Sequence, residues 1–234
     1  MHDHDVARAR RVFLTKGLAL AGSLAVPGAV ASAIRPHDSE TAAANRASAL
    51  ASAPRVAAQP ITSSRVVRPE LLRRAMASLD RHGSRIAQRD RIGIVDFDAG
   101  SSQPRFHFVD LVSGHSESLL VSHGSGSDPS HTGYVRRFSN EFGSNASCEG
   151  TFVTADYYVG KHGRSQKIDG LDPTNDNALA RAIVIHTAWY ANPDMIRTHG
   201  MLGRSQGCFA VGERDLDQVF ARLGQGRMLF AAKV

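Results

Sequence analysis

One stretch of the chain, residues 183–211, constrains the fold more than any other. It begins with three β-branched or apolar residues, 183–185, which favour a buried strand, and His186 follows them directly. Cys208 lies near its end, as the last residue of a Ser-Gln-Gly-Cys tetrapeptide. A cysteine becomes a nucleophile when a neighbouring histidine takes its proton. A fold that brings this strand end and this turn together therefore creates a site for thiol acyl transfer.

The residues around Cys208 predict a reactive thiol. A lone cysteine is most often a small buried hydrophobe, but Gly207 leaves room for backbone N–H groups to face a substrate carbonyl. The polar approach at 204–206 and a helix expected shortly afterwards indicate an exposed turn. A thiolate in such an electropositive turn has a lowered pKa. We therefore expect Cys208 to be exposed and readily ionised.

Two histidines compete for the role of its partner. His186, after an apolar run, also fits the pattern of a hydrogen-bonded core histidine, and His199 lies closer to Cys208 in the sequence. A metal site built from His186, His199 and Cys208 is a third interpretation. The chain has no HExxH and no CxxC motif to support it. We therefore expect neither a metal nor a cofactor.

The cysteine count bounds the redox chemistry. The chain has two cysteines, Cys148 and Cys208, which excludes a disulfide-rich secreted scaffold. A single bridge between them stays open as an alternative in an oxidising compartment. Such a bridge would occupy the nucleophile and silence the site.

The N-terminus has the pattern of an export signal at 1–33. The pair Arg10-Arg11 resembles the twin-arginine consensus, and a general secretory signal is the alternative. The apolar run at 17–30 is interrupted by glycine and proline and is short for a bilayer span, and the small residues at 31–33 suit cleavage. An uncleaved anchor stays open. The Ala-, Ser-, Pro- and Arg-rich residues 34–68 predict a disordered spacer.

The charge of the chain favours an anionic partner without naming it. The formal net charge is +6, which suits a cell wall, a membrane surface or a nucleic acid. No nucleic-acid recognition motif is present, so we expect no nucleic-acid partner. The Gly- and Ser-rich segment 123–137 lacks GxxxxGK[ST], which excludes a P-loop, and His123 and His131 within it are expected to be polar loop residues.

Downstream of the spacer, the hydrophobic period changes from helical to strand-like. After a helix at 69–82, alternating segments indicate an antiparallel meander. Further helical pieces are expected at 84–88, 177–182 and 212–223, and strands at 92–97, 105–111, 116–122, 151–159, 183–186 and 227–232. This order predicts a β-rich α+β domain at 69–234, with mixed or antiparallel sheets and a few peripheral helices.

The segment IVIHTAWY…HGMLGRSQGCFAV resembles the L,D-transpeptidase (YkuD-type) catalytic family, in particular its murein L,D-transpeptidase-like branch. In that family a histidine on a strand lies upstream of an S-x-G-C signature, as His186 and residues 205–208 do here. The resemblance extends to VDFDAGSSQPRFHFVDLVSG, SHGSGS, YYVGKHGRS and DGLDPTNDNALARAIVIH, and covers roughly residues 90–232. It implies a β-sandwich or barrel with peripheral helices.

The resemblance also implies a reaction and roles for matching residues. Cys208 attacks a peptidoglycan stem tetrapeptide between the L-centre of diaminopimelate and D-Ala, and His186 is the general base and later the acid. Backbone N–H groups around Gly207 and Cys208 form the oxyanion hole. Residues expected to contact the substrate are Thr187, His199, Arg204 and Ser205. Thr187 is also expected to orient the imidazole, and Phe209 to narrow the acyl pocket.

The acyl acceptor separates the remaining functions. An amine of a second stem gives a transpeptidase, and water gives an L,D-carboxypeptidase or endopeptidase with the same thioester. A non-catalytic wall-binding module, with Cys148 bridged to Cys208, is the alternative of another class. In each case we expect the partner to be peptidoglycan and the location to be the periplasm or the cell wall.

Overall fold

The computed structural model describes residues 67–234 of the chain. The export signal expected at 1–33 lies outside the described residues, as does the spacer expected at 34–68 apart from its last two residues. Within the described part, no helix is both long enough and apolar enough to cross a membrane.

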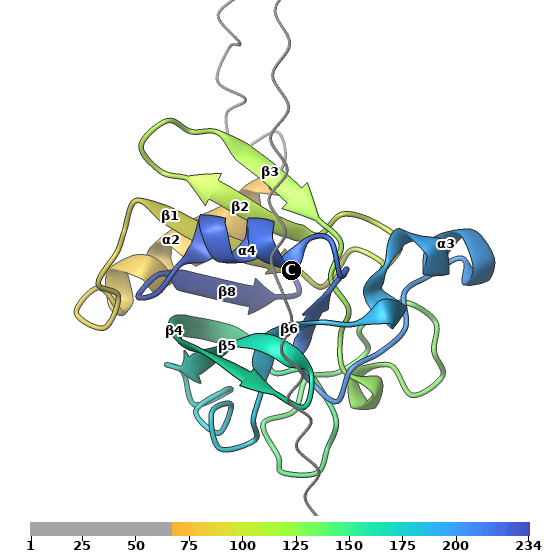
Figure 1. Ribbon diagram of the computed structural model, residues 1–234. Coiled ribbons are helices and arrows are strands. Elements are labelled where there is room, and N and C mark those ends of the chain that lie inside the picture. Colours follow the sequence, from red (N-terminus) through yellow and green to blue (C-terminus); the bar gives the residue numbers. More distant parts are fainter. Residues whose placement is uncertain (1–66) are drawn as a thin grey trace, which may run out of the picture. The chain divides into compact units, whose positions relative to one another are not determined.

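Eight strands form one mixed sheet in the order β3-β2-β1-β8-β4-β5-β6-β7 (Figure 1). Their bounds are β1 Arg91–Asp96, β2 Phe106–Asp110, β3 Ser116–Leu119, β4 Gly150–Gly160, β5 Gly163–Gly170, β6 Val184–Thr187, β7 Phe209–Val211 and β8 Met228–Ala232. The sheet is not closed, because β3 and β7 end the order. The β-rich α+β class is therefore confirmed, as an open sheet and not a barrel.

Three helices flank the sheet in residues 67–234: α2 (Pro69–Arg81), α3 (Pro193–His199) and α4 (Leu216–Leu223). The predicted helix at 69–82 is α2, whose Leu71, Ala75 and Leu79 are buried in one hydrophobic cluster with residues of β1 and β8. The buried side chains of α4 belong to a second cluster. Figure 1 shows α4 in front of the β1–β8 part of the sheet and α2 behind it.

The C-terminal strand β8 joins the two halves of the sheet. It pairs in parallel with β1 and antiparallel with β4. On one side of it, β1, β2 and β3 form the predicted antiparallel meander. On the other, β4 and β5 form a hairpin, and β6 and β7 follow. An entirely buried strand therefore holds the second half, which carries His186, onto the first.

Several local predictions were wrong, each because tertiary pairing outweighs local pattern. Residues 84–88 and 177–182 form turns and not helices. Strand β5, with the sequence GRSQKIDG, was missed because Ile168 is its one large apolar residue. It forms because β4 and β6 pair with it on both sides. The short α3 and β7 were missed as well.

The first described residues are part of the domain. Val67 is fully buried in the cluster under α2. Arg68 pairs with the carboxylates of Asp96 and Asp98 and donates a hydrogen bond to the Val234 carbonyl. Two residues predicted to lie in the spacer thus tie the start of α2 to the end of β1 and to the C-terminus.

We expect Leu71→Ala to lower the free energy of unfolding by about 2–4 kcal/mol, because it leaves a void between α2 and the sheet. Arg74→Ala, on the exposed face of the same helix, is the matched control and should change it by no more than about 0.5 kcal/mol. Urea denaturation of both variants measures the difference. Equal unfolding midpoints for the two variants would contradict the packing described here.

Candidate active site

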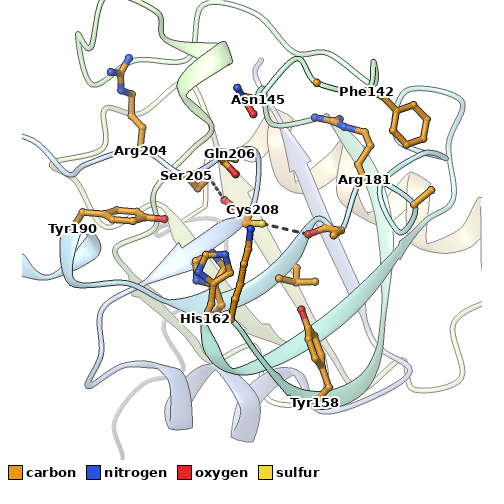
Figure 2. A pocket seen from close by; sticks show the side chains of 16 residues that line it. Phe142, Asn145, Tyr158, His162, Arg181, Tyr190, Arg204, Ser205, Gln206 and Cys208 are labelled. Carbon is orange, nitrogen blue, oxygen red and sulfur yellow. Dashed lines mark hydrogen bonds between the residues drawn. The ribbon is translucent and has the colours of Figure 1, made fainter. Parts of the chain in front are cut away.

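A cavity of about 630 Å³ lies beside β6 and the residue that precedes β7. Its walls also come from the β4–β5 hairpin, from two loops and from the turn before Cys208. The lining residues are Phe142, Gly143, Asn145, Tyr158, Lys161, His162, Ala180, Arg181, Ala182, Val184, His186, Tyr190, Arg204, Ser205, Gln206 and Cys208. Figure 2 shows Cys208 in the middle of the labelled residues, with Arg204 and Arg181 on opposite sides of it.

The pairing of β6 with β7 brings the histidine and the cysteine to this cavity. The two strands are parallel, with Ile185 opposite Phe209 and His186 opposite Ala210. Cys208 immediately precedes β7 and so continues the register to Val184, two residues before His186 on the same face of β6, and all three residues line the cavity. The sequence placed both residues in one site, and the structure brings both to one cavity.

Cys208 differs from the exposed turn residue that the sequence predicted. A strand, β7, follows it directly, and α4 begins only at Leu216. The Cys208 residue is consequently only 8% exposed. Burial raises the pKa of its thiol, against smaller opposing effects of the Val184 backbone and the Lys161 charge. The prediction of a lowered pKa was therefore wrong, because desolvation outweighs the nearby positive charges.

His186 is held in one orientation and one tautomer. Its Nδ1 donates a hydrogen bond to the Thr187 carbonyl over 2.7 Å, which leaves Nε2 as an acceptor. Burial is the main effect that lowers the pKa of His186 to about 4; the neighbouring His162 and Lys161 act in the same direction, and the Thr187 contact opposes them. The imidazole is therefore neutral at neutral pH, the form that accepts a proton.

The thiol and the imidazole are not hydrogen-bonded to each other within the described chain. The Cys208 thiol donates to the Ala182 carbonyl, with an Sγ–O distance of 3.5 Å. Ala182 has φ +55°, a left-handed conformation that is uncommon for alanine. The backbone strain at this residue turns its carbonyl towards the sulfur. The resting pair is thus a neutral thiol and a neutral imidazole, each held by a backbone carbonyl.

The turn before Cys208 requires a glycine and is clamped by a serine. Gly207 has φ +113°, and a Cβ there would lie 2.6 Å from the Ile183 side chain. The Gly207 N–H donates to Ser205 Oγ over 3.1 Å, and the Ser205 hydroxyl donates to the Cys208 carbonyl over 2.7 Å. The Gly207 N–H, which we expected to face the substrate, is therefore engaged inside the turn.

The other predicted contact residues divide into two groups. Arg204 and Ser205 line the cavity, and Arg204 donates to the Asp128 and Pro129 carbonyls. Thr187 and His199 do not line it. Thr187 acts on the site through its carbonyl, whereas His199 ends α3 and is exposed.

Phe209 also departs from its predicted role. It is buried in the core, where it stacks on Phe97 and meets Phe152 edge-on. It does not line the cavity, so it cannot narrow the acyl pocket by direct contact. Strand alternation explains the difference, because the residue after Cys208 points to the opposite face of the sheet.

A buried polar chain supports the turn from behind. Arg105 has no exposed surface, and its guanidinium donates to the Val121 carbonyl and to His123 Nδ1. His123 in turn lies 3.4 Å from an Asp128 carboxylate oxygen. The backbone carbonyl of His123 accepts a hydrogen bond from the Ser205 N–H. His123, predicted to be a polar loop residue, is therefore fully buried and part of the scaffold of the turn.

Both cysteines are free. Cys148 is fully buried, and burial raises the pKa of its thiol to about 11. The bridge between Cys148 and Cys208 that the sequence left open is therefore not present. The described residues also contain no cluster of three or more His, Cys, Asp or Glu side chains that could hold a metal ion.

A family model for the L,D-transpeptidase catalytic domain matches residues 63–232, which is more than half of the chain. The chain belongs to the L,D-transpeptidase catalytic domain family. No curated protein sequence matches the chain.

Solved structures of L,D-transpeptidases are similar to this family member at low identity. The L,D-transpeptidase from Mycobacterium smegmatis is 12% identical over 61% of this chain and 58% of that chain, with a TM-score of 0.38. The L,D-transpeptidase from Stackebrandtia nassauensis is 14% identical over 63% of this chain and 57% of that chain, also with a TM-score of 0.38. The chain therefore spans less than two thirds of the length of these structures, and its family membership rests on the family match.

The β4–β5 hairpin of this L,D-transpeptidase family domain brings to the cavity two residues that the sequence did not indicate. His162 stacks on His186, with ring centroids 4.1 Å apart and planes 18° from parallel. Lys161, next to it, lines the cavity. The turn Gly-Lys-His-Gly was visible in the sequence, but without a predicted β5 it was not recognised as a hairpin tip. Arg181 and Tyr190 were missed because a turn carries the first and a short 3₁₀ helix, Trp189–Ala191, carries the second.

We expect His162→Ala to raise the pKa of His186 from about 4 towards the ordinary value. The substitution removes a ring that keeps water from His186 and removes a repelling charge at low pH, and both effects favour the protonated form. NMR titration of ¹³C-labelled histidine measures the change, with the exposed His199→Ala as the control. An unchanged titration of His186 in the His162 variant would contradict the role of the stack.

Proposed function

We propose that the chain is a peptidoglycan L,D-transpeptidase that works through a thioester on Cys208. One observation carries the proposal. The parallel register of β6 and β7 puts a neutral His186, with Nε2 free to accept, in the same cavity as the Cys208 thiol, in a chain of this family. A thiol and an adjacent base are the groups that nucleophilic acyl transfer requires.

Acylation begins with a neutral pair. When a stem peptide enters the cavity, the Cys208 proton passes to His186 Nε2 and the sulfur attacks the carbonyl carbon of the L-centre of diaminopimelate. For this transfer the Cys208 thiol exchanges its hydrogen bond to the Ala182 carbonyl for one to the imidazole. The imidazolium that forms stays hydrogen-bonded through Nδ1 to the Thr187 carbonyl, which is a favourable partner for a cation.

The developing oxyanion needs a donor other than the Gly207 N–H. That group is bonded to Ser205 Oγ, so we assign the oxyanion contact to the N–H of Cys208 itself, which the Ser205 clamp orients. Removing one donor of this kind typically costs about 10²–10³ in rate. Ser205, expected to contact the substrate, would thus act mainly by shaping the turn.

Collapse of the tetrahedral intermediate completes the first half of the reaction. The bond to the D-Ala nitrogen breaks, the imidazolium of His186 gives its proton to that nitrogen, and the thioester remains on Cys208. An amine of a second stem then attacks the thioester and passes its proton to His186, which regenerates the thiol. The reaction takes place outside the cytoplasm, in the periplasm or at the cell wall, if the export signal expected at 1–33 operates.

We expect Cys208→Ala to abolish formation of the acyl-enzyme and His186→Ala to slow it by at least about 10²-fold, because the thiol then lacks its base. Intact-protein mass spectrometry after mixing with a disaccharide tetrapeptide measures the adduct. Cys148→Ala is the matched control and should acylate normally, since its buried thiol takes no part. Full turnover by Cys208→Ala would show the proposal to be wrong.

The same experiment identifies the acyl acceptor. Analysis of the muropeptide products shows cross-linked dimers if an amine resolves the thioester and trimmed tripeptides if water does. A transpeptidase gives dimers as the main product when a second stem is supplied. Tripeptides alone would instead assign the chain as an L,D-carboxypeptidase.

A further inference from the structure

The charge of the cavity is one-sided. Its lining includes three side chains that carry a full positive charge, Lys161, Arg181 and Arg204, and no aspartate or glutamate. None of the three forms an ion pair within residues 67–234. Several surface arginines elsewhere in the described chain pair with acids close by, as Arg164 does with Asp217 and Arg197 with Asp194. The cavity therefore holds positive charge that the protein itself does not neutralise.

Two of the three cations are bound to the chain by neutral acceptors. Arg181 donates to the Ser139 and Ala146 carbonyls and to the Ser144 hydroxyl. Arg204 donates to two loop carbonyls. These contacts hold both guanidiniums in the walls, using three of the five N–H groups of Arg181 and the Nη1 group of Arg204. Both therefore contribute positive potential to the cavity from positions that the chain fixes.

Lys161 is different. It is exposed at the tip of the β4–β5 hairpin and lines the cavity. No hydrogen bond or ion pair joins its ammonium to any other residue in the described part of the chain. Lys161 directly precedes His162, whose ring stacks on His186 with centroids 4.1 Å apart, so the hairpin tip that carries it lies on the His186 side of the cavity. All three of its N–H donors are available to a ligand.

We propose that Lys161 binds the free C-terminal carboxylate of the donor stem peptide, so that the enzyme selects donors that end in a carboxylate next to the scissile bond. This inference rests on the proposed function and specifies its substrate. The carboxylate of a C-terminal D-amino acid is attached to the carbon that bears the scissile nitrogen. The Lys161 ammonium, in the wall of the cavity that holds the nucleophile, can therefore bind it, and Arg181 and Arg204 add long-range attraction.

Stem peptides that differ in the position or the charge of their C-terminal carboxylate should react at different rates. A tetrapeptide stem presents its carboxylate at the scissile residue, whereas a pentapeptide carries it one residue further away. An amide at the same position keeps the shape and loses the charge. A charge-assisted hydrogen bond of this kind changes the specificity by about tenfold or more.

The test compares two donors on the full chain: a stem tetrapeptide ending in D-Ala and the same peptide ending in D-alaninamide. The parent protein should acylate about tenfold faster in kcat/KM with the acid. Lys161→Gln should lose that advantage, chiefly through a higher KM for the acid, so that its kcat/KM becomes about equal for the two donors. Lys161→Arg should restore much of it. The control is Lys167→Gln, a lysine on β5 that does not line the cavity, which should behave as the parent does.

Two results would overturn the proposal: equal use of both donors by the parent, or an equal loss with both donors in Lys161→Gln. The second result would mean that Lys161 acts on the thiol and not on the substrate.

If neither donor acylates the protein, the proposed function is wrong, but the carboxylate site at Lys161 can still be tested by a separate measurement. N-acetyl-D-alanine should slow alkylation of Cys208 by iodoacetamide, and its amide should not, with mass spectrometry locating the modified cysteine. This protection should vanish in Lys161→Gln. Equal protection by acid and amide would show that no carboxylate subsite exists.

Discussion

The parallel pairing of β6 with β7 is the interaction on which the site depends. His186 and Cys208 are far apart in the sequence. The chain between them forms a short 3₁₀ helix, Trp189–Ala191, and then helix α3 before it returns to the sheet. The ladder that sets Ile185 opposite Phe209 brings the end of one strand and the start of the other to a single cavity. That ladder holds because β5 covers the other edge of β6, and β4 and β8 connect it to the core.

Burial then sets the chemistry of the pair. Desolvation raises the pKa of the Cys208 thiol and lowers that of the His186 imidazole, so both rest in their neutral forms. The nucleophile is generated only when a proton moves between them, in a cavity that a substrate has entered. The β4–β5 hairpin adds His162 over the imidazole and Lys161 in the wall of the cavity. One hairpin tip thus contributes both to the base and to the electrostatics of the cavity.

A rigid scaffold holds the turn at Cys208. The Ser205 hydroxyl bridges the turn from inside, and the backbone of His123 holds Ser205 from outside. Behind them, burial lowers the pKa of Arg105 to about 9, against the opposing charges of Asp96 and Asp128, so it stays protonated at neutral pH. A buried cation with several hydrogen bonds is costly to rearrange, which keeps this wall of the cavity in place.

The sequence by itself determined the residues whose signal is local: helix α2, the meander, the strand before His186 and the Ser-Gln-Gly-Cys turn. Gly207 was singled out as a source of room for backbone N–H groups, whereas the structure shows that its φ of +113° and its close packing on Ile183 require a glycine. The tertiary structure decided the rest. The weakly apolar β5 forms only between two partners, and its hairpin delivers Lys161 and His162. The exposure of Cys208 and both pKa shifts depend on what covers the site, and a linear pattern carries no information about that cover.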